Sequence, residues 1–185
     1  DYFATGKLNT EVLESVVSGL SEACVQNNCV LIGGETAEMP DFYSIDEYDI
    51  SGTIVGVVEK NNMIPKREVC SGDILIGLPS TGLHTNGYSL ARKVLLGHYN
   101  IDDFVPEIST TISDALLKIH RSYLKVCDKI LDKNWLTGIS HITGGGIINN
   151  TNRVINKDQS LEINWNAWQR PPIFNLIQDI GSVPE

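Results

Sequence analysis

The sequence lacks several features that define common classes of protein. Its four cysteines form no C-x-x-C pair and have no histidine at zinc-finger spacing, which argues against a structural metal site. No apolar run approaches the roughly 20 residues that cross a bilayer, and no targeting segment is recognisable. Lysine and arginine are not clustered and the net charge is −9, which disfavours binding to nucleic acid or to an anionic membrane. We therefore expect a cytoplasmic protein whose partner is a small molecule.

The length and composition allow a globular protein of one large domain or two small ones. Hydrophobic residues make up 42% of the 185 residues, which is enough to supply a core. The chain opens at Asp1 without a methionine and stops at Glu185 just after an apparent helix. We therefore expect it to be an excerpt of a longer protein.

The first third of the chain shows the pattern of one helix and two strands. After a plausible helix start at Asn9, apolar residues recur at helical spacing. They are Leu13, Val16, Val17, Leu20 and Cys24. The short apolar run Cys29–Ile32 predicts a buried strand that ends at a glycine pair. The stretch Tyr48–Val58 is rich in β-formers and predicts a central or interface strand.

A polar stretch broken by Pro65, residues 61–71, predicts a linker to a second unit. That unit begins with Asp73–Leu78, which predicts another buried strand. A short apolar helix face over Leu90–Leu95 and a longer one from Ile112 to Leu131 follow. We expect both helices to pack on the new strand.

The last part of the chain repeats the alternation of strand and helix. Ile139 and Ile142 predict a strand that runs into three glycines, and a helix is expected from about Ile147. A final helix follows Pro171-Pro172, because proline is well tolerated in a first turn. Strands alternating with helices predict the α/β class, with α+β layers in both units.

Three loops and the opening segment carry residues suited to binding or catalysis. The first loop places two carboxylates, Glu35 and Glu38, and the hydroxyl of Thr36 behind Gly33-Gly34. Oxygen ligands of this kind suit Mg²⁺. The alternative is a surface turn in which both glutamates cap a following helix. Spacing alone does not separate the two interpretations.

The second loop, Ser80–Ser89, combines hydroxyls, His84, an amide and two glycines before a helix. A helix start of this kind favours anions, and His84 would act there as a general acid or base or would stabilise a transferring phosphoryl group. The alternative, which the residues alone slightly favour, is a loop histidine bonded to its own backbone. His98 and His120 lie away from the loops in sequence and are given no role.

The third loop, His141–Gly146, ends in three successive glycines. Backbone amides there are free to close around phosphate oxygens. The loop lacks the spacing of a Walker A or G-x-G-x-x-G motif, so an ordinary strand-to-helix turn is an open alternative.

The opening segment Asp1–Leu8 offers a carboxylate and an ammonium on either side of Gly6. Asp1 suits magnesium and Lys7 suits a phosphate. Without further information, solvated side chains are the favoured interpretation.

Taken together, five segments resemble the aminoimidazole ribonucleotide synthetase family in order and spacing. The segments are DYFATGKL, GGETAEMPDFY, EYDISGTIVGVVEK, GDILIGLPSTGLHTNGYSLARKVL and HITGGGIINNTNRV. GGETAEMP and GLHTNGYSL are the most specific, and the resemblance covers nearly the whole chain.

The resemblance implies a two-domain α/β subunit that forms a homodimer through its N-terminal sheet, with the active site between the domains. Residues 1–60 would be the rear of the N-terminal ATP-binding domain, 61–71 a linker, and 72–185 a truncated C-terminal domain. It also implies the use of ATP and Mg²⁺ to cyclise formylglycinamidine ribonucleotide to aminoimidazole ribonucleotide in purine biosynthesis, with release of ADP and phosphate.

Residue by residue, the resemblance implies a catalytic role for His84. It implies magnesium binding by Asp1 and Glu35. The residues it implies for ATP are Asp1, Gly6, Lys7, Gly33 and Gly34. The residues it implies for the substrate are Thr36, Asn86, Gly87, Thr143, Gly144, Gly145 and Gly146.

The chain departs from the family pattern at two internal points. The usual P-T-R-I-Y reads Ile119-His120-Arg121-Ser122-Tyr123, and the usual E-N-I-P-R reads Asn149-Asn150-Thr151-Asn152-Arg153. Family segments expected before Asp1 and after Glu185 are absent, so we expect the 185 residues alone to be inactive. Alternatives are another ATP-using enzyme of the superfamily or a non-catalytic scaffold.

Overall fold

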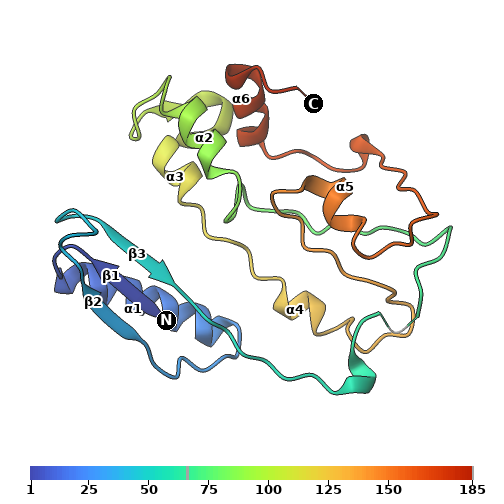
Figure 1. Ribbon diagram of the computed structural model, residues 1–185. Helices are drawn as coiled ribbons and strands as arrows, with labels where there is room; N and C mark the ends of the chain where they lie inside the picture. The colour runs from blue at the N-terminus through green and yellow to red at the C-terminus, as the bar shows by residue number, and fades with distance from the viewer. Residues whose placement is uncertain (66, 185) are drawn as a thin grey trace. The chain divides into compact units, whose positions relative to one another are not determined.

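The structure is a computed structural model that describes every residue except 66 and 185, which belong to the predicted linker and C-terminal domain (Figure 1). The chain divides into two compact units, which we call unit 1 and unit 2. Unit 1 comprises Asp1–Lys60 and Leu124–Asp128, and unit 2 comprises Asn61–Tyr123 and Lys129–Glu185.

Unit 1 is built on a three-stranded mixed sheet with β1 (Tyr2–Thr5) at its centre. The strand β2 (Glu35–Glu38) runs parallel to β1, and β3 (Tyr48–Ser51) runs antiparallel on the other side. Phe3 pairs with a residue of each neighbour and is buried. The buried strand of this sheet is therefore β1, because it has a partner strand on each side.

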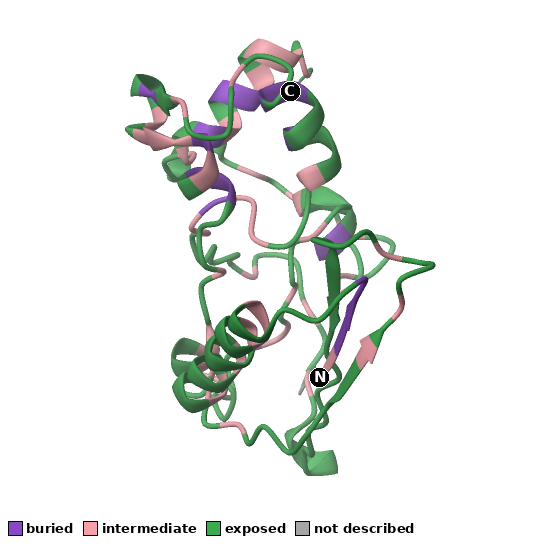
Figure 2. Ribbon diagram, turned by 90° about the vertical axis from the view of Figure 1, so that its left-hand side faces the viewer, coloured by how far each residue is buried: buried purple, intermediate pink, exposed green. Residues whose placement is uncertain are grey.

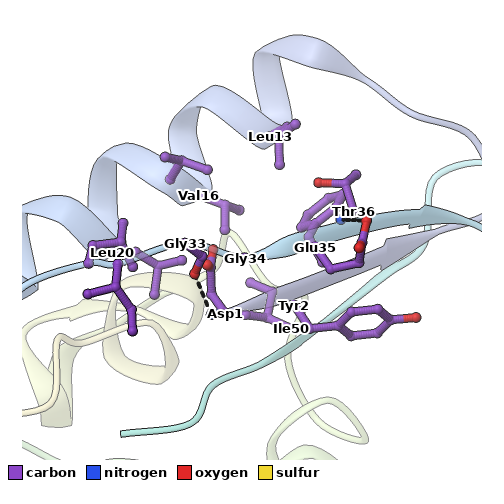
Figure 3. Close-up of a pocket in the computed structure, with 14 residues that line it drawn as sticks. Asp1, Tyr2, Leu13, Val16, Leu20, Gly33, Gly34, Glu35, Thr36 and Ile50 are labelled. Carbon is purple, nitrogen blue, oxygen red and sulfur yellow. Dashed lines mark hydrogen bonds between the residues drawn. The ribbon is translucent and has the colours of Figure 1, made fainter. Parts of the chain in front are cut away.

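Helix α1 (Thr10–Gln26) lies alongside this sheet (Figures 1 and 3). The side chain of Asn9 caps it by accepting hydrogen bonds from the main-chain N–H groups of Glu11 and Val12, at 3.0 and 3.3 Å. Such a cap satisfies amides that lack a partner in the first turn. The predicted helix and its apolar face are confirmed, because Leu13, Val16 and Leu20 point toward the strands in Figure 3.

Two predictions for unit 1 are wrong. Cys29–Ile32 is no strand, and Val30 and Ile32 are 77% and 93% exposed. The strand begins later, so that much of the predicted loop is β2 itself. The stretch 48–58, predicted as a central or interface strand, is strand only at β3, and β3 lies at the sheet edge and not at its centre. A run of β-formers becomes a strand only where a partner strand supplies hydrogen bonds.

Unit 2 packs three helices and a short hairpin around its main core. These elements are α2 (Tyr88–Leu95), α3 (Ile112–Leu116) and α6 (Pro172–Gly181), with β4 (Phe104–Val105), the 3₁₀ turn η2 (Pro106–Ile108) and β5 (Thr110–Thr111). The core residues are Ala91, Leu95, Val105, Ile112, Ala115, Leu116, Ile173, Leu176 and Ile177. Figure 2 shows the same pattern, with buried residues gathered in the helices near the C-terminus.

The remaining helices are short. They are α4 (Leu124–Cys127), α5 (Gly146–Thr151) and the 3₁₀ turns η1 (Lys60–Asn62) and η3 (Trp165–Ala167). The predicted helices near residues 90, 147 and 172 are confirmed by α2, α5 and α6.

Three predictions for the second half of the chain are wrong. Asp73–Leu78 forms no strand, and Ile74 is 87% exposed. No strand forms at Ile139 and Ile142 either, which are both exposed. The long helix predicted from Ile112 to Leu131 is interrupted between α3 and α4, because residues 117–123 are not helical. The apolar residues keep their helical spacing across residues 117–123, although this segment is a connection between α3 and α4.

Candidate functional site

A cavity of about 340 Å³ in unit 1 gathers most of the candidate residues of the N-terminal part (Figure 3). It lies between α1 and the sheet, and the apolar side chains of α1 form one of its walls. The candidates that line it are Asp1, Gly33, Gly34, Glu35 and Thr36. The structure therefore brings together the start of β1 and the start of β2, as the parallel pairing of these strands requires.

Main-chain hydrogen bonds hold these residues in place. The main-chain nitrogen of Asp1 donates to the carbonyl of Gly33 at 3.1 Å, and the N–H of Glu35 donates to the carbonyl of Asp1 at 3.1 Å. The glycine pair passes so close to Asp1 that a Cβ on Gly34 would overlap the Asp1 carboxylate. The close approach explains why a residue without a side chain occupies position 34.

The lining of this cavity is mostly apolar, and its charged side chains are carboxylates. Its lining has the carboxylates of Asp1 and Glu35 and contains no lysine or arginine. Mg²⁺ is commonly held by one or two carboxylates together with phosphate oxygens and water. Among the described residues no group of three or more His, Cys, Asp or Glu side chains is placed to hold a metal. A magnesium ion here would therefore depend on the ligand for its other oxygens.

Gly6 and Lys7 are not part of this cavity. Lys7 lines a smaller hollow of about 110 Å³, together with Asp46 and Tyr48. Gly6 is buried, and its N–H donates to the carbonyl of Glu47 at 3.4 Å. Gly6 and Lys7 therefore lie elsewhere in unit 1 than the residues that line the larger cavity.

In unit 2, His84 lies in the loop before α2 and has a left-handed backbone, with φ of 57°. Its Nε2 accepts a hydrogen bond from the main-chain N–H of Thr81 at 3.0 Å. The Thr81 hydroxyl also lies 2.9 Å from Nε2, but it donates its proton to the carbonyl of Ile119 at 2.8 Å. Nε2 is therefore the acceptor and Nδ1 carries the proton of the neutral ring. The predicted bond between His84 and its own loop is present.

His120, for which we predicted no role, is stacked on His84. The two ring centroids are 3.8 Å apart and the rings are inclined by 18°. The His141 ring lies 6.3 Å from that of His120, and the Tyr123 ring lies 6.2 Å from that of His84. The prediction that His120 lies apart from the candidate loops is wrong, because it contacts the second loop and neighbours the third.

Three tyrosine and threonine hydroxyls tie the segment 116–123 to the loop 79–88. Each hydroxyl donates to a main-chain carbonyl of the other segment. The pairs are Tyr88 to Leu116 at 2.6 Å, Thr81 to Ile119 at 2.8 Å and Tyr123 to Pro79 at 3.1 Å. These bonds run along the same stretch that the sequence predicted to be helix, so the stretch serves to hold the histidine loop.

Burial and, after it, nearby positive charge favour the neutral forms of His84 and His120. Burial, then His120, Arg121 and His141, hold the pKa of His84 below its ordinary value of 6.5. Burial, then His141, lowers the pKa of His120 in the same direction. Burial raises the pKa of the Tyr123 hydroxyl above 10.0, and Arg121 opposes this. His84 and His120 are therefore uncharged at neutral pH.

The third loop is fixed from inside by Asn150, a residue that sequence reasoning did not select. Asn150 is 1% exposed; its amide nitrogen donates to the carbonyl of Gly146 at 2.8 Å, and its side-chain oxygen accepts from the Thr143 hydroxyl at 3.1 Å. The N–H of Gly146 donates to the carbonyl of Thr143 at 3.0 Å. The amides of Gly144 and Gly145 are consequently the ones that a phosphate would meet.

Asn86 and Gly87 follow His84 at the surface of unit 2. Gly87 is the N-cap residue of α2, and the Asn86 side chain is exposed. The exposed amide is accessible to a ligand next to the histidine cluster.

Comparison with known proteins matches both parts of the chain. Residues 1–58 match the N-terminal domain, and residues 71–183 the C-terminal domain, of AIR synthase related proteins. These matches confirm the predicted α/β class with two domains. The chain belongs to the AIR synthase related family.

Particular relatives align with the chain from end to end. One from Thermoanaerobacter pseudethanolicus is 46% identical over 187 residues, which cover all of this chain and 55% of the relative. One from Syntrophotalea carbinolica is 46% identical and covered to 53%, and one from Arabidopsis thaliana is 44% identical and covered to 48%. All three are named phosphoribosylformylglycinamidine cyclo-ligase, the last as chloroplastic. The chain spans about half the length of the curated relatives it matches.

Within the described residues, no helix combines the length and the apolar composition needed to cross a membrane.

Proposed function

We propose that the protein is a phosphoribosylformylglycinamidine cyclo-ligase of purine biosynthesis. The observation that carries the proposal is the alignment of the whole chain with proteins of that name at 44–46% identity. We also propose that the protein requires ATP and Mg²⁺, forms a homodimer and is cytoplasmic.

The proposed reaction uses the γ-phosphoryl group of ATP to make the formyl oxygen a leaving group. That oxygen bonds to the phosphorus and ADP departs. The internal nitrogen then forms a bond to the formyl carbon, the C–O bond breaks, phosphate leaves with its electron pair, and the nitrogen loses a proton. Such chemistry depends on positioning and on stabilising developing charge more than on covalent help.

His84 is the proposed catalytic residue. Because its Nε2 already accepts from Thr81, the neutral ring presents Nδ1–H as a donor to the reacting oxygen or to the transferring phosphoryl group. The lowered pKa of His84 supports this role, since the donor is then available in the neutral form down to a pH below the ordinary histidine range.

The other candidates are assigned by the groups that they offer. Asp1 and Glu35 would hold Mg²⁺, which would bring ATP phosphate oxygens to the unit 1 cavity beside Gly33 and Gly34. Lys7 is proposed to meet a phosphate of the nucleotide, and Gly6 is proposed as part of the same ATP-binding segment.

Substrate contacts are proposed for residues from both units. Thr36 and Asn86 would donate or accept hydrogen bonds, with Gly87 in the same loop as Asn86. The main-chain amides of the loop Thr143–Gly146 would bind the ribose phosphate, principally those of Gly144 and Gly145.

The test is ADP release by the complete protein with and without formylglycinamidine ribonucleotide, with detection of the aminoimidazole product. Replacing His84 by Ala should lower kcat by about 100-fold or more, as for loss of one preorganised donor. The matched control is His98→Ala. His98 is exposed, and Nδ1 of its ring lies 3.1 Å from the carbonyl of Val94 in α2.

Each result decides between stated alternatives. Substrate-dependent turnover that falls in the folded His84 variant and not in the His98 variant supports the proposal. ADP release that needs a different substrate would move the protein to another ATP-using enzyme of the family. A folded protein that does not bind ATP would indicate a scaffold.

A further inference from the structure

The hydrogen bond from Thr81 fixes only one point of the His84 ring. An imidazole held at Nε2 can still turn about the axis of that bond, and turning changes where Nδ1–H points. A second contact, on the face of the ring, is needed to remove this freedom. His120 provides such a contact, since its ring lies 3.8 Å from that of His84 and within 18° of parallel.

The main chain that carries His120 is itself fixed to the His84 loop. The carbonyl of Ile119, the residue before His120, accepts the Thr81 hydroxyl at 2.8 Å, and the Tyr123 hydroxyl bonds to Pro79 at 3.1 Å. Both bonds lie within three positions of His120, on either side of it. The His120 ring is thus placed against His84 by bonds that do not involve either imidazole.

We propose that His120 is a positioning residue for His84, which fixes the plane of the His84 ring and therefore the direction of its Nδ1–H bond. This proposal rests on the proposed function for its effect on catalysis.

The groups that face His84 also favour an uncharged pair. They are His120, Arg121, His141 and the ring of Tyr123. A proton on His120 would face His84 across the stack and repel a second proton there. The lowered pKa of both histidines is consistent with a stack of two neutral rings at pH 7.

The experiment compares His120→Thr with His120→Phe in the complete protein. Threonine removes the ring, whereas phenylalanine keeps a flat ring and removes the titrating group. We expect His120→Thr to lower kcat by about three- to tenfold, which is the range of a lost aromatic contact, with little change in KM. The Phe variant should recover most of this loss. The pKa of His84 should rise in it, because one source of positive charge is gone.

Nitrogen NMR of the His84 ring supplies a readout that does not depend on turnover. In the wild type and the Phe variant we expect one neutral form with the proton on Nδ1. In the Thr variant we expect exchange between ring orientations or tautomers. His98→Phe is the control, and it should change neither the His84 signals nor kcat.

The outcomes separate this inference from the proposed function. Equal loss of kcat in the Thr and Phe variants, or unchanged His84 signals in the Thr variant, overturns the positioning role. A Thr variant that does not fold leaves the Phe variant to decide, because loss of the single Nδ1-protonated form of His84 in that variant, which keeps a flat ring at position 120, overturns the proposal. Altered His84 signals in the Thr variant, together with a wild type that lacks cyclo-ligase activity, would sustain the positioning role and refute the proposed function.

Discussion

Replacing Gly6 by alanine should destabilise unit 1, although it adds a single methyl group. Gly6 follows β1 and is buried beneath the loop that contains Tyr43 and Ser44. A Cβ built on Gly6 would fall well inside van der Waals contact with the main-chain carbonyl oxygens of both residues. These atoms belong to the backbone and cannot move aside as a flexible side chain can. Overpacking of this kind costs about 1–3 kcal/mol.

The same substitution at Gly19 provides the matched control, because it should act with the opposite sign. Gly19 lies within α1, is exposed, and has no atom within 4 Å of an added Cβ. Alanine is favoured over glycine inside a helix by about 0.5–1 kcal/mol. Both variants add the same methyl group, in one case against main-chain oxygens and in the other on the open surface of a helix.

Hydrogen exchange measured by mass spectrometry on peptides from residues 1–58 is the suitable assay. Slow amides of β1 and α1 should exchange faster in Gly6→Ala by a factor that corresponds to the lost stability, and slower or unchanged in Gly19→Ala. A Gly6→Ala protein with wild-type protection would refute the reasoning, since it would mean that the backbone above Gly6 moves aside at no cost.

Two further predictions concern unit 2. Asn150→Ala should lower the free energy of unfolding by about 1–3 kcal/mol, because the Thr143 hydroxyl and the Gly146 carbonyl lose their buried partner. Urea unfolding followed by tryptophan fluorescence measures this, and an unchanged midpoint contradicts it. His84 and His120 have a lowered pKa in the folded state, so the unfolded chain binds more protons below about pH 6.5. The stability that they contribute is present above that pH and is lost as the pH falls through the lowered pKa values. Urea midpoints measured across this range should show the loss. Replacing both histidines by Phe should reduce the dependence of the midpoint on pH.

Helices α1 and α6 could be predicted from the sequence because their signals are local. The cap at Asn9 and the apolar spacing of α1 lie within the same stretch of chain, and the start of α6 is marked by its own prolines. No partner elsewhere is needed to define these elements, which is why their predictions agree with the structure.

The strands could not be predicted in the same way because a strand is defined by its partner. Cys29–Ile32 has more β-propensity than Glu35–Glu38, yet only the latter pairs with β1. The polar strand β2 is explained by register with β1 and not by its composition. β-Propensity therefore predicted a strand near β2 in the sequence but assigned it to the wrong residues.

The candidate loops illustrate the same division between local and distant information. His84 and the glycines around residue 145 were recognised from the types of residue that they combine. His120 was missed because its sequence neighbours suggest a surface position on a helix, whereas the interruption of that helix turns the ring onto His84. The only sequence signal was its departure from the family pattern at that position.

The histidine cluster and the segment that supports it are linked through one residue, Thr81. Thr81 determines which nitrogen of His84 carries the proton, while the Ile119 carbonyl takes the Thr81 hydroxyl proton that would otherwise compete for Nε2. A Thr81→Val variant keeps the main-chain donor and the shape but removes the hydroxyl. It should therefore leave the His84 tautomer unchanged and loosen the segment that carries His120. The tautomer of His84 and the placement of His120 thus depend on different atoms of the same residue.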